Sequence, residues 1–382
     1  MRQWPEIALG DVLCRSSEPA VCLPDAEYDE VTIRLWGKGV ISRGKVRGVD
    51  VTAPRRVVRA NQLILSKIDA RNGAIGLVPQ ELDGAIVSND FPSFEFAESK
   101  QLDPAFMGWM VRSRHFVDLC RAASEGTTNR VRIKEDRFLA QKIVLPPLPE
   151  QQAIVSRLDT LAEKARQVNE HLDSIERDGD RLLAVRFRDA IADAAMRSMA
   201  EVAPLVRREI DIELEGSYPE LGIRSFGKGS FHKPPLTGAD VGTKRLFSIE
   251  PGDLLFSNVF AWEGAIAVAQ AEDAGRFGSH RFITCRVDPD ITSPEFLRYY
   301  FLTKAGLEKI GEASPGGAGR NRTLGLNKLM AIQVPTPSPA MQRTFDTLQT
   351  KVAELKATHA TIRQSNDALI PATLERLFAG AD

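Results

Sequence analysis

The sequence has few of the residues that build disulfides or metal sites. Its four cysteines form no Cys-x-x-Cys pair, and its five histidines are scattered without the spacing that metal ligands require. We therefore expect reduced thiols, ordinary histidines and no metal site in this chain.

Long apolar runs are also missing. No stretch approaches the roughly 18 apolar residues that cross a bilayer, and the first residues, MRQWPEIALGDVL, lack a basic segment followed by an apolar one. The sequence predicts a cytoplasmic protein with no membrane contact. Its apolar content of 43% is nevertheless enough for the cores of two or three ordinary domains.

Catalytic motifs are absent as well. The segment closest to a phosphate-binding loop, GIRSFGKGS (222–230), has Gly229 where such a loop needs Ser or Thr. Asp90, Glu98 and Lys100 resemble a nuclease set, but a solvated surface run explains them better. No glycine-rich loop for S-adenosylmethionine and no Asn/Asp-Pro-Pro-aromatic motif for amino-methyl transfer is present. We expect a chain that catalyses no reaction and binds no cofactor.

The formal net charge is only −1, but the charge is unevenly distributed. Between residues 34 and 71, ten Lys or Arg residues accompany two acids. Such a segment can line a surface that contacts phosphates, although basic clusters on other proteins are often merely solvated.

What the sequence does contain is an internal duplication. The second copy follows the first at a distance of about 190 residues, and it keeps apolar and glycine positions while the charged residues differ. The matched pairs are LGDVL (9–13) with MAEVA (199–203), WGKG (36–39) with FGKG (226–229), NQLILSKIDARNGAIGLV (61–78) with GDLLFSNVFAWEGAIAVA (252–269), and SEGTTNRVRI (124–133) with SPGGAGRNRTL (314–324). This pattern predicts two homologous modules with different ligands.

Each module mixes strands and helices. QLILSKID (62–69) and DLLFSNVF (253–260) alternate apolar and polar residues, which predicts strands. LDPAFMGWMVRSRHFVDLC (102–120) and SPEFLRYYFLTKAGLEKI (293–310) have the period of amphipathic helices.

Each module ends in a proline corner, LPPLPEQQ (145–152) or VPTPSPAMQ (334–342), followed by apolar residues at intervals of three and four. These intervals are typical of a coiled-coil seam. The expected seam residues are Ile154, Leu158, Leu161, Ala165, Val168, Leu172, Ile175 and Leu182, then Phe345, Leu348, Val352, Leu355, His359, Ile362, Asn366 and Leu369. Two helices packed separately on their own modules are the alternative, which so narrow a repeat makes less favoured.

The loops GTTNRVR (126–132) and GAGRNR (317–322) each place Arg beside Asn among small residues. In a major groove Arg pairs with guanine and Asn with adenine, and small residues let the backbone approach phosphate. An ordinary turn is the alternative. Recurrence at equivalent places favours a DNA-reading loop.

The corner PPLPEQQAIVSRLDTL (146–161), preceded by GTTNRVRIKEDRFLAQKIVL (126–145) and by a strand of the GDLLFSN type, resembles the specificity (S) subunit of type I restriction-modification systems. The resemblance covers nearly the whole chain. It implies two target-recognition domains that each read one half of a bipartite site in double-stranded DNA. Two long helices would pair antiparallel and set the gap between the halves.

The resemblance also implies partners and a prokaryotic cell. Two modification (M) subunits would dock on the chain and supply adenine-N6 methylation, and restriction (R) subunits would cleave unmodified DNA. Those subunits, and not this chain, would use S-adenosylmethionine, ATP and Mg²⁺.

The expected fold class is therefore a duplicated α/β (α+β) chain, elongated and pseudo-twofold. Target-recognition domains are expected at residues 1–148 and 196–337, and spacer helices that form an antiparallel coiled coil at 149–195 and 338–382. One alternative is a non-catalytic coiled-coil adaptor whose duplicated domains bind protein, without salt-dependent DNA affinity. Another is an enzyme that cleaves or methylates DNA by itself, which the missing motifs argue against.

The residues expected to contact DNA are polar or basic. They are Arg43, Lys45, Arg47, Lys67, Arg71, Thr127, Asn129 and Arg130 in the first module, and Lys228, Lys233, Asn258, His280, Arg281, Arg320, Asn321 and Arg322 in the second. Partner docking is expected at Pro147, Pro149, Glu150, Gln151 and Gln152. The second corner lacks the glutamate, so the sequence leaves open whether the two corners dock partners equivalently.

Overall fold

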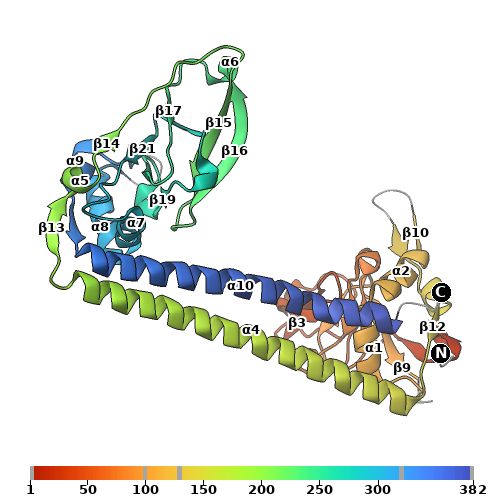
Figure 1. Ribbon diagram of the computed structural model, residues 1–382. Helices are drawn as coiled ribbons and strands as arrows, with labels where there is room; N and C mark the ends of the chain where they lie inside the picture. Colours follow the sequence, from red (N-terminus) through yellow and green to blue (C-terminus); the bar gives the residue numbers. More distant parts are fainter. Residues whose placement is uncertain (1–3, 98–100, 127–130, 318–321, 379–382) are drawn as a thin grey trace. The chain divides into compact units, whose positions relative to one another are not determined.

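The computed structural model describes residues 4–97, 101–126, 131–317 and 322–378 (Figure 1). The chain divides into unit 1, which contains residues 1–172 and 359–382, and unit 2, which contains residues 173–358. Each unit combines one domain with parts of two long helices, α4 (Leu148–Ile191) and α10 (Pro339–Phe378). Within the described residues, no helix is both long and apolar enough to cross a bilayer.

The domain of unit 1 is mixed. Its strands are β1 (Glu6–Ala8), β2 (Leu13–Ser16), β3 (Glu27–Ile33), β4 (Val40–Arg47), β5 (Arg56–Val57), β6 (Leu63–Leu65), β7 (Ile75–Leu77), β8 (Ile86–Val87), β9 (Ser93–Phe96), β10 (Ser124–Glu125), β11 (Arg132–Ile133) and β12 (Lys142–Val144). Its helices include α1 (Pro104–Met110), α2 (Arg114–Ala122), α3 (Glu135–Leu139) and the short 3-10 turns η3 (Ala70–Asn72) and η4 (Gln80–Leu82). The larger sheets have the orders β2-β9-β6-β7 and β4-β3-β8-β5.

The domain of unit 2 repeats this plan. Its strands are β13 (Ala195–Ser198), β14 (Leu205–Val206), β15 (Ser217–Ile223), β16 (Ser230–Thr237), β17 (Leu246–Ser248), β18 (Leu254–Ser257), β19 (Ile266–Val268), β20 (Phe277–Ser279), β21 (Phe282–Cys285) and β22 (Gln333–Thr336). Its helices include α5 (Met199–Val202), α6 (Gly238–Val241), α7 (Pro294–Leu302), α8 (Lys304–Ala313), α9 (Leu326–Ala331) and the turns η6 (Ala261–Glu263) and η7 (Ala271–Asp273). The sheet orders β14-β21-β18-β19 and β16-β15-β20-β17 match those of unit 1 strand for strand. The predicted duplication and mixed fold class are confirmed.

Each segment predicted to be helical within a domain forms two helices instead of one. Ser113 separates α1 from α2, and its hydroxyl accepts a hydrogen bond of 3.2 Å from the Phe116 amide. Thr303 separates α7 from α8 and accepts in the same way from the Gly306 amide. A hydroxyl that caps a helix start satisfies a free amide there, so the chain turns without losing backbone hydrogen bonds.

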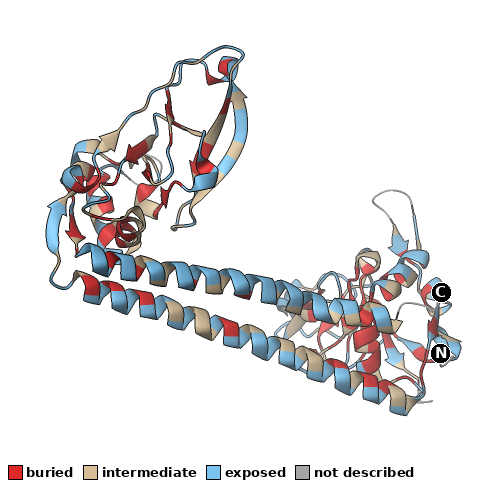
Figure 2. Cartoon of the chain, viewed as in Figure 1, coloured by how far each residue is buried: buried red, intermediate tan, exposed pale blue. Residues whose placement is uncertain are grey.

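The two long helices complete the core of each unit. In unit 1, Ile154 and Leu158 of α4 and Leu374 of α10 belong to the same buried cluster as the domain's phenylalanines. In unit 2, the Phe187 ring of α4 lies 5.3 Å from Phe345 of α10 and 5.0 Å from Phe296 of α7. Figure 2 colours the buried residues red, and many of them lie in the domains and on the nearby parts of the long helices. The prediction of paired helices is confirmed within each unit, and the alternative of separate packing is wrong.

The helices run antiparallel, but part of the predicted seam is wrong. Within unit 1, Asn366 donates to the Ala165 carbonyl and to Asn169, and within unit 2, Lys356 pairs with Asp180. Four predicted seam residues are instead about 40% exposed: Val168, Leu182, Ile362 and Leu369. A straight helix has about 3.6 residues per turn, so a strict 3.5-residue repeat drifts off its contact face over several turns. The contact stripe follows the helix and takes in Asn169 and Leu183.

The four cysteines form no disulfide with one another. All four are free, and burial raises the pKa of Cys120 and of Cys285 to about 12. At that pKa almost none of the reactive thiolate forms near neutral pH.

Both proline corners are held by a buried glutamine at the start of the following helix. Gln151 is fully buried, and its side-chain amide donates to the carbonyls of Pro146 (2.8 Å) and Gln101 (2.7 Å). Its side-chain oxygen accepts from the backbone amide of Asp103 (2.8 Å), the residue that caps α1. The first turn of α4 is thereby tied to the first turn of α1.

The equivalent Gln342 repeats this arrangement in unit 2. It donates to the carbonyls of Pro337 (2.8 Å) and Ile291 (3.0 Å), and it accepts from the amide of Ser293 (2.9 Å), which caps α7. We refer to Gln151 and Gln342 with these partners as the glutamine clamps. They fix each long helix to its own domain.

Candidate nucleic-acid interface

The predicted DNA residues Lys67 and Asn258 follow equivalent strands, β6 and β18, and have the same backbone environment. In unit 1, the Lys67 amide donates to the Asp90 carbonyl, and the Ile133 amide donates to the Lys67 carbonyl, both at 2.8 Å. In unit 2, Asn258 makes the same two hydrogen bonds, with Arg281 and Leu324, at the same distance. We call these places the strand-end junctions. Each brings together three segments that are far apart in the sequence.

The junction of unit 1 is a hollow of about 490 Å³ with charges of both signs. Lys67 lies 2.9 Å from Glu135, Arg132 lies 2.8 Å from Asp90, and Arg15 contacts Glu135 at 3.2 Å. Of these, the Arg132–Asp90 pair is exposed on both sides, and exposed ion pairs contribute only about 0–1 kcal/mol, so a DNA phosphate can compete with the Asp90 carboxylate for Arg132. Arg15 was not predicted from the sequence.

The junction of unit 2 is a hollow of about 570 Å³ lined by Asn258, Val259, Phe260, His280, Arg281 and Thr323, none of which is acidic. It brings together three predicted residues: Asn258, His280 and Arg281. The Asn258 side-chain oxygen is buried and has no hydrogen-bond partner among the described residues. A buried polar atom left without a partner costs about 1–3 kcal/mol. A donor on a bound ligand would remove that cost.

Several other predicted basic residues lie on an edge strand of the second sheet in each unit. Arg43, Lys45 and Arg47 are exposed on β4. Lys45 and Arg47 lie 3.9 and 3.4 Å from Glu27 and Asp50, distances at which exposed pairs are weak. These side chains therefore remain accessible to a polyanion.

Unit 2 presents fewer charges along its equivalent edge. Lys233 on β16 is half-buried, 3.9 Å from Glu220, and Lys228 is exposed in the preceding turn. His232 lies 2.9 Å from the buried carboxylate of Asp273, which ties the edge strand to η7. The two units thus differ in edge charge although their strand orders agree.

Two residues that were predicted to contact DNA lie in contact with other parts of the protein. Arg322 packs over the Trp262 ring at 4.9 Å and donates to the carbonyls of Gly311 and Ser314, so its guanidinium holds the end of α8. Arg71 is half-buried on η3, where its carbonyl accepts from the Arg121 guanidinium at 3.0 Å. The remaining predictions in the glycine-rich loops lie outside the described residues: Thr127, Asn129, Arg130, Arg320 and Asn321.

At the first corner, the residues predicted to dock a partner differ in exposure. Pro147, Pro149 and Gln152 are exposed, and Glu150 is half-buried and accepts a hydrogen bond from the Trp4 indole. Gln151 has no exposed surface, because its side chain forms the clamp. A partner at this surface can therefore reach four of the five side chains.

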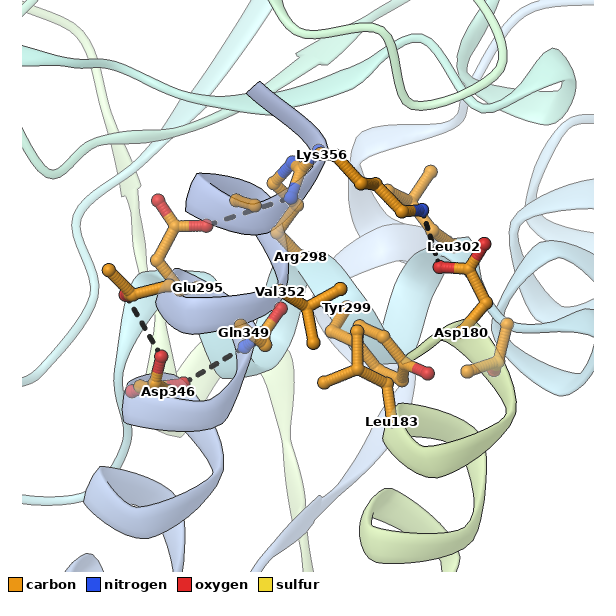
Figure 3. A pocket seen from close by; sticks show the side chains of 13 residues that line it. Asp180, Leu183, Glu295, Arg298, Tyr299, Leu302, Asp346, Gln349, Val352 and Lys356 are labelled. Carbon is orange, nitrogen blue, oxygen red and sulfur yellow. Dashed lines mark hydrogen bonds and ion pairs between the residues drawn. The ribbon is translucent and has the colours of Figure 1, made fainter. Parts of the chain in front are cut away.

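Unit 2 also has a hollow of about 590 Å³ where α7 meets α4 and α10 (Figure 3). Lys356 pairs with Asp180 at 2.6 Å, and Arg298 lies 3.7 Å from Glu295, so most of its charge is neutralised internally. Burial raises the pKa of Asp346, as the nearby Glu295 also does, although hydrogen bonds from Ser293 and Gln349 oppose the shift. This hollow lines the domain–helix contact and contains none of the predicted DNA residues.

Phe260 and Thr323 at the junction of unit 2 were not predicted as site residues. Phe260 lies in a strand segment whose apolar periodicity suggests a core position, yet 37% of it is exposed. Thr323 directly follows the glycine-rich loop. Its position next to that loop was the sequence evidence that could have identified it as a site residue. Both could have been found by extending each predicted site to its sequence neighbours.

Known proteins share the sequence pattern and the fold. Residues 2–177 match the family described as type I restriction modification DNA specificity domain, and no curated protein matches the sequence. The crystal structure of the HsdS subunit from Thermoanaerobacter tengcongensis aligns with a TM-score of 0.64 and 21% identity over 100% of this chain and 97% of its own.

A chain from a structure described as showing complex assembly and conformational transition of the type I R-M system aligns with a TM-score of 0.71 and 20% identity. That alignment covers 100% of this chain and 98% of the other. At these identities, the two solved structures establish the fold across both domains and both long helices.

Proposed function

We propose that this chain, which belongs through residues 2–177 to the family of type I restriction modification DNA specificity domains, recognises a split site in double-stranded DNA. Each domain reads one half of the site, and the two long helices set the gap between the halves. The chain directs adenine-N6 methylation by partner modification subunits and cleavage by restriction subunits.

The pair of strand-end junctions carries this proposal. Both have the same backbone hydrogen bonds at 2.8 Å, but Lys67 and Asp90 of unit 1 are replaced by Asn258 and Arg281 in unit 2. Side chains that point donors and acceptors at base edges determine which sequence is bound, whereas the backbone scaffold only positions them. One scaffold with two sets of side chains suits a protein that reads two different half-sites.

Chemistry on the DNA is assigned to the partners. We propose that the chain itself binds no cofactor, and that two modification subunits use S-adenosylmethionine while restriction subunits use ATP and Mg²⁺. Pro147, Pro149, Glu150 and Gln152 form the proposed docking surface at the first corner. Met341 stands at the second corner in place of Glu150, so we expect the two corners to contribute unequally to docking.

The decisive measurement is the map of N6-methyladenine in the host genome. Deleting the gene should abolish methylation at one bipartite motif, and restoring it should restore that motif. If a strain without this gene keeps every methylated motif of the wild type, the proposal is wrong. A protein-binding adaptor would in addition show no DNA affinity that falls with salt concentration.

Substitutions in one unit test the assignment of half-sites. Arg281→Ala should relax or change the bases methylated in one half of the motif, and Lys67→Ala should affect only the other half. Lys351→Ala is a suitable control in unit 2, because Lys351 is exposed on α10 and lines neither junction. A change that affected both halves equally would contradict one domain reading one half-site.

A further inference from the structure

Each unit exposes a large aromatic ring in the turn between its two longest strands. Trp36 lies between β3 and β4 and is 62% exposed, and Phe226 lies between β15 and β16 and is 76% exposed. Large aromatic side chains are usually buried because their surface is mostly apolar. Two exposed rings at equivalent positions therefore call for an explanation.

The backbone at both rings is strained. Trp36 has φ of 61° and Phe226 has φ of 62°, in the left-handed region that bulky residues rarely adopt. Trp and Phe differ in size and polarity, yet the backbone conformation is the same in both units. The packing of one particular ring therefore does not explain the strained conformation. Strain of this kind concentrates at functional sites.

Backbone hydrogen bonds hold each turn in place. The Trp36 amide donates to the Asn72 carbonyl at 3.0 Å, and the Phe226 amide donates to the Glu263 carbonyl at 2.8 Å. The following amides, of Gly37 and Gly227, donate at 2.9 Å to the carbonyls of Gly73 and Gly264. Each ring is therefore fixed beside the short turn, η3 or η6, that follows the strand-end junction.

The turns are also basic and open. Residues 34–39 contain Arg34 and Lys38 and no acid, and residues 224–229 contain the equivalent Arg224 and Lys228 and no acid. A side chain added at Gly39 or Gly229 would meet nothing within 4 Å, so the backbone there is free for close approach. An aromatic ring beside cationic groups and open glycine backbone suits a nucleic acid better than an apolar protein surface.

We propose that these two turns contact the DNA, with the Trp36 and Phe226 rings packed against bases or deoxyribose and Lys38 and Lys228 against phosphates. This inference rests on the proposed function and adds a contact type to it. It gives each unit one aromatic anchor beside its strand-end junction. The ring is exposed in the free protein because its partner is the duplex.

The test uses the purified full chain and a duplex that carries the motif methylated in the host genome, with a scrambled duplex for comparison. Trp36→Asn removes the ring and relieves the strain, because Asn tolerates the left-handed region. We expect this variant to melt no lower than the wild type and to bind the motif about 10-fold more weakly. Trp36→Phe, the residue of the other unit, should recover most of that affinity.

Leu23→Ala is the matched control, since Leu23 is 61% exposed in the same unit but lies outside the turn. It should bind as the wild type does. Unchanged affinity of Trp36→Asn overturns the inference, as does a loss of affinity that is accompanied by a lower melting temperature. Unchanged affinity with weaker association of a modification subunit would also overturn it and assign the turn to a protein contact.

The two proposals fail in different ways. If the wild-type chain binds the motif and the scrambled duplex equally, the proposed function fails and this inference falls with it. If the wild type discriminates and Trp36→Asn binds equally well, only the aromatic contact is wrong. The reciprocal variant Phe226→Asn provides the same readout in unit 2.

Discussion

The two domains share one backbone fold, but at one equivalent set of positions unit 1 has apolar residues and unit 2 has a polar network. In unit 1, Val40 and Leu82 pack in an apolar cluster, and the nearby Pro79 has no amide proton to satisfy. All three are aliphatic, so this part of unit 1 has no charge that depends on pH.

In unit 2 the equivalent residues are Ser230, Asp273 and Gln270. The Asp273 carboxylate is 1% exposed and accepts from the Ser230 hydroxyl (2.9 Å) and the Gln270 amide (3.0 Å), with His232 at 2.9 Å. Burial alone would raise the pKa of Asp273, but these hydrogen bonds bring it below its ordinary value. A fully satisfied polar network can thus replace an apolar cluster in one fold, and it makes that unit sensitive to acid.

The largest expected effect tests what the units have in common, the glutamine clamps. Gln151→Ala and Gln342→Ala should each destabilise their own unit by about 2–4 kcal/mol, because buried carbonyls and an amide lose their partners. Amide hydrogen exchange of the full chain can be followed on individual peptides. It then gives the free energy of unfolding of each unit separately.

The exposed neighbours Gln152 and Arg343 supply controls. Their replacement by Ala should change the free energy of unfolding by no more than about 0.5 kcal/mol. Gln342 accepts one further hydrogen bond, from the Thr292 hydroxyl at 2.8 Å, so its loss should be at least as large as that of Gln151. A loss at Gln342 far below the loss at Gln151 would show that the corners are energetically different despite their similar geometry.

The next effect tests the difference between the units. Asp273→Ala should destabilise unit 2 by about 1–3 kcal/mol at neutral pH, since its donors lose a buried acceptor. The triple change Ser230→Val, Gln270→Pro and Asp273→Leu imports the residues of unit 1 and removes the Ser230 and Gln270 donors together with the acceptor. The remaining partner, His232, is 41% exposed and can bond to water instead. It should recover most of the loss.

The wild type and the triple variant should differ in how the stability of unit 2 depends on pH. The pKa of Asp273 is lowered in the folded unit, so the carboxylate stabilises unit 2 above its ordinary value of 3.8, and this stability is lost as the pH falls through the folded pKa. Hydrogen exchange of unit 2 measured between pH 7 and 3 should show that loss in the wild type and not in the triple variant. An equal loss in both would mean that other carboxylates control acid sensitivity.

Much of the fold could be predicted because the repeat preserves the residues that fix the backbone. Gly73 and Gly264 have φ of 76° and 79°, which few other residues adopt, and they recur at equivalent places. The seam was harder to predict, because Asn169 is a polar residue in the contact stripe and the apolar Val168 beside it is exposed. A seam predicted from apolar residues alone therefore included Val168 in place of Asn169.

The candidate site was predictable only in part, for reasons that differ between residues. Lys67, Asn258 and His280 were predicted from the sequence and lie at the strand-end junctions, and their contact with DNA stays a prediction. The clamp of Gln151 was not predicted, because its partners are backbone atoms, which every residue type provides. Arg322 was predicted from its loop, but its contact with Trp262 depends on how two distant segments fold together.

The smallest effect concerns Asp346 of α10, where unit 1 has Val155. Burial raises the pKa of Asp346 in the folded unit, so the charged carboxylate opposes folding at neutral pH, and the penalty disappears as the pH falls below the ordinary value of 3.8. Asp346→Asn should therefore stabilise unit 2 by up to about 0.5 kcal/mol at pH 7 and have no effect at pH 3. The exposed Asp193→Asn is the control, with no change expected at either pH. A destabilised Asp346→Asn at pH 7 would mean that the hydrogen bonds from Ser293 and Gln349 outweigh burial, and that this carboxylate, like Asp273, stabilises unit 2 in its charged form.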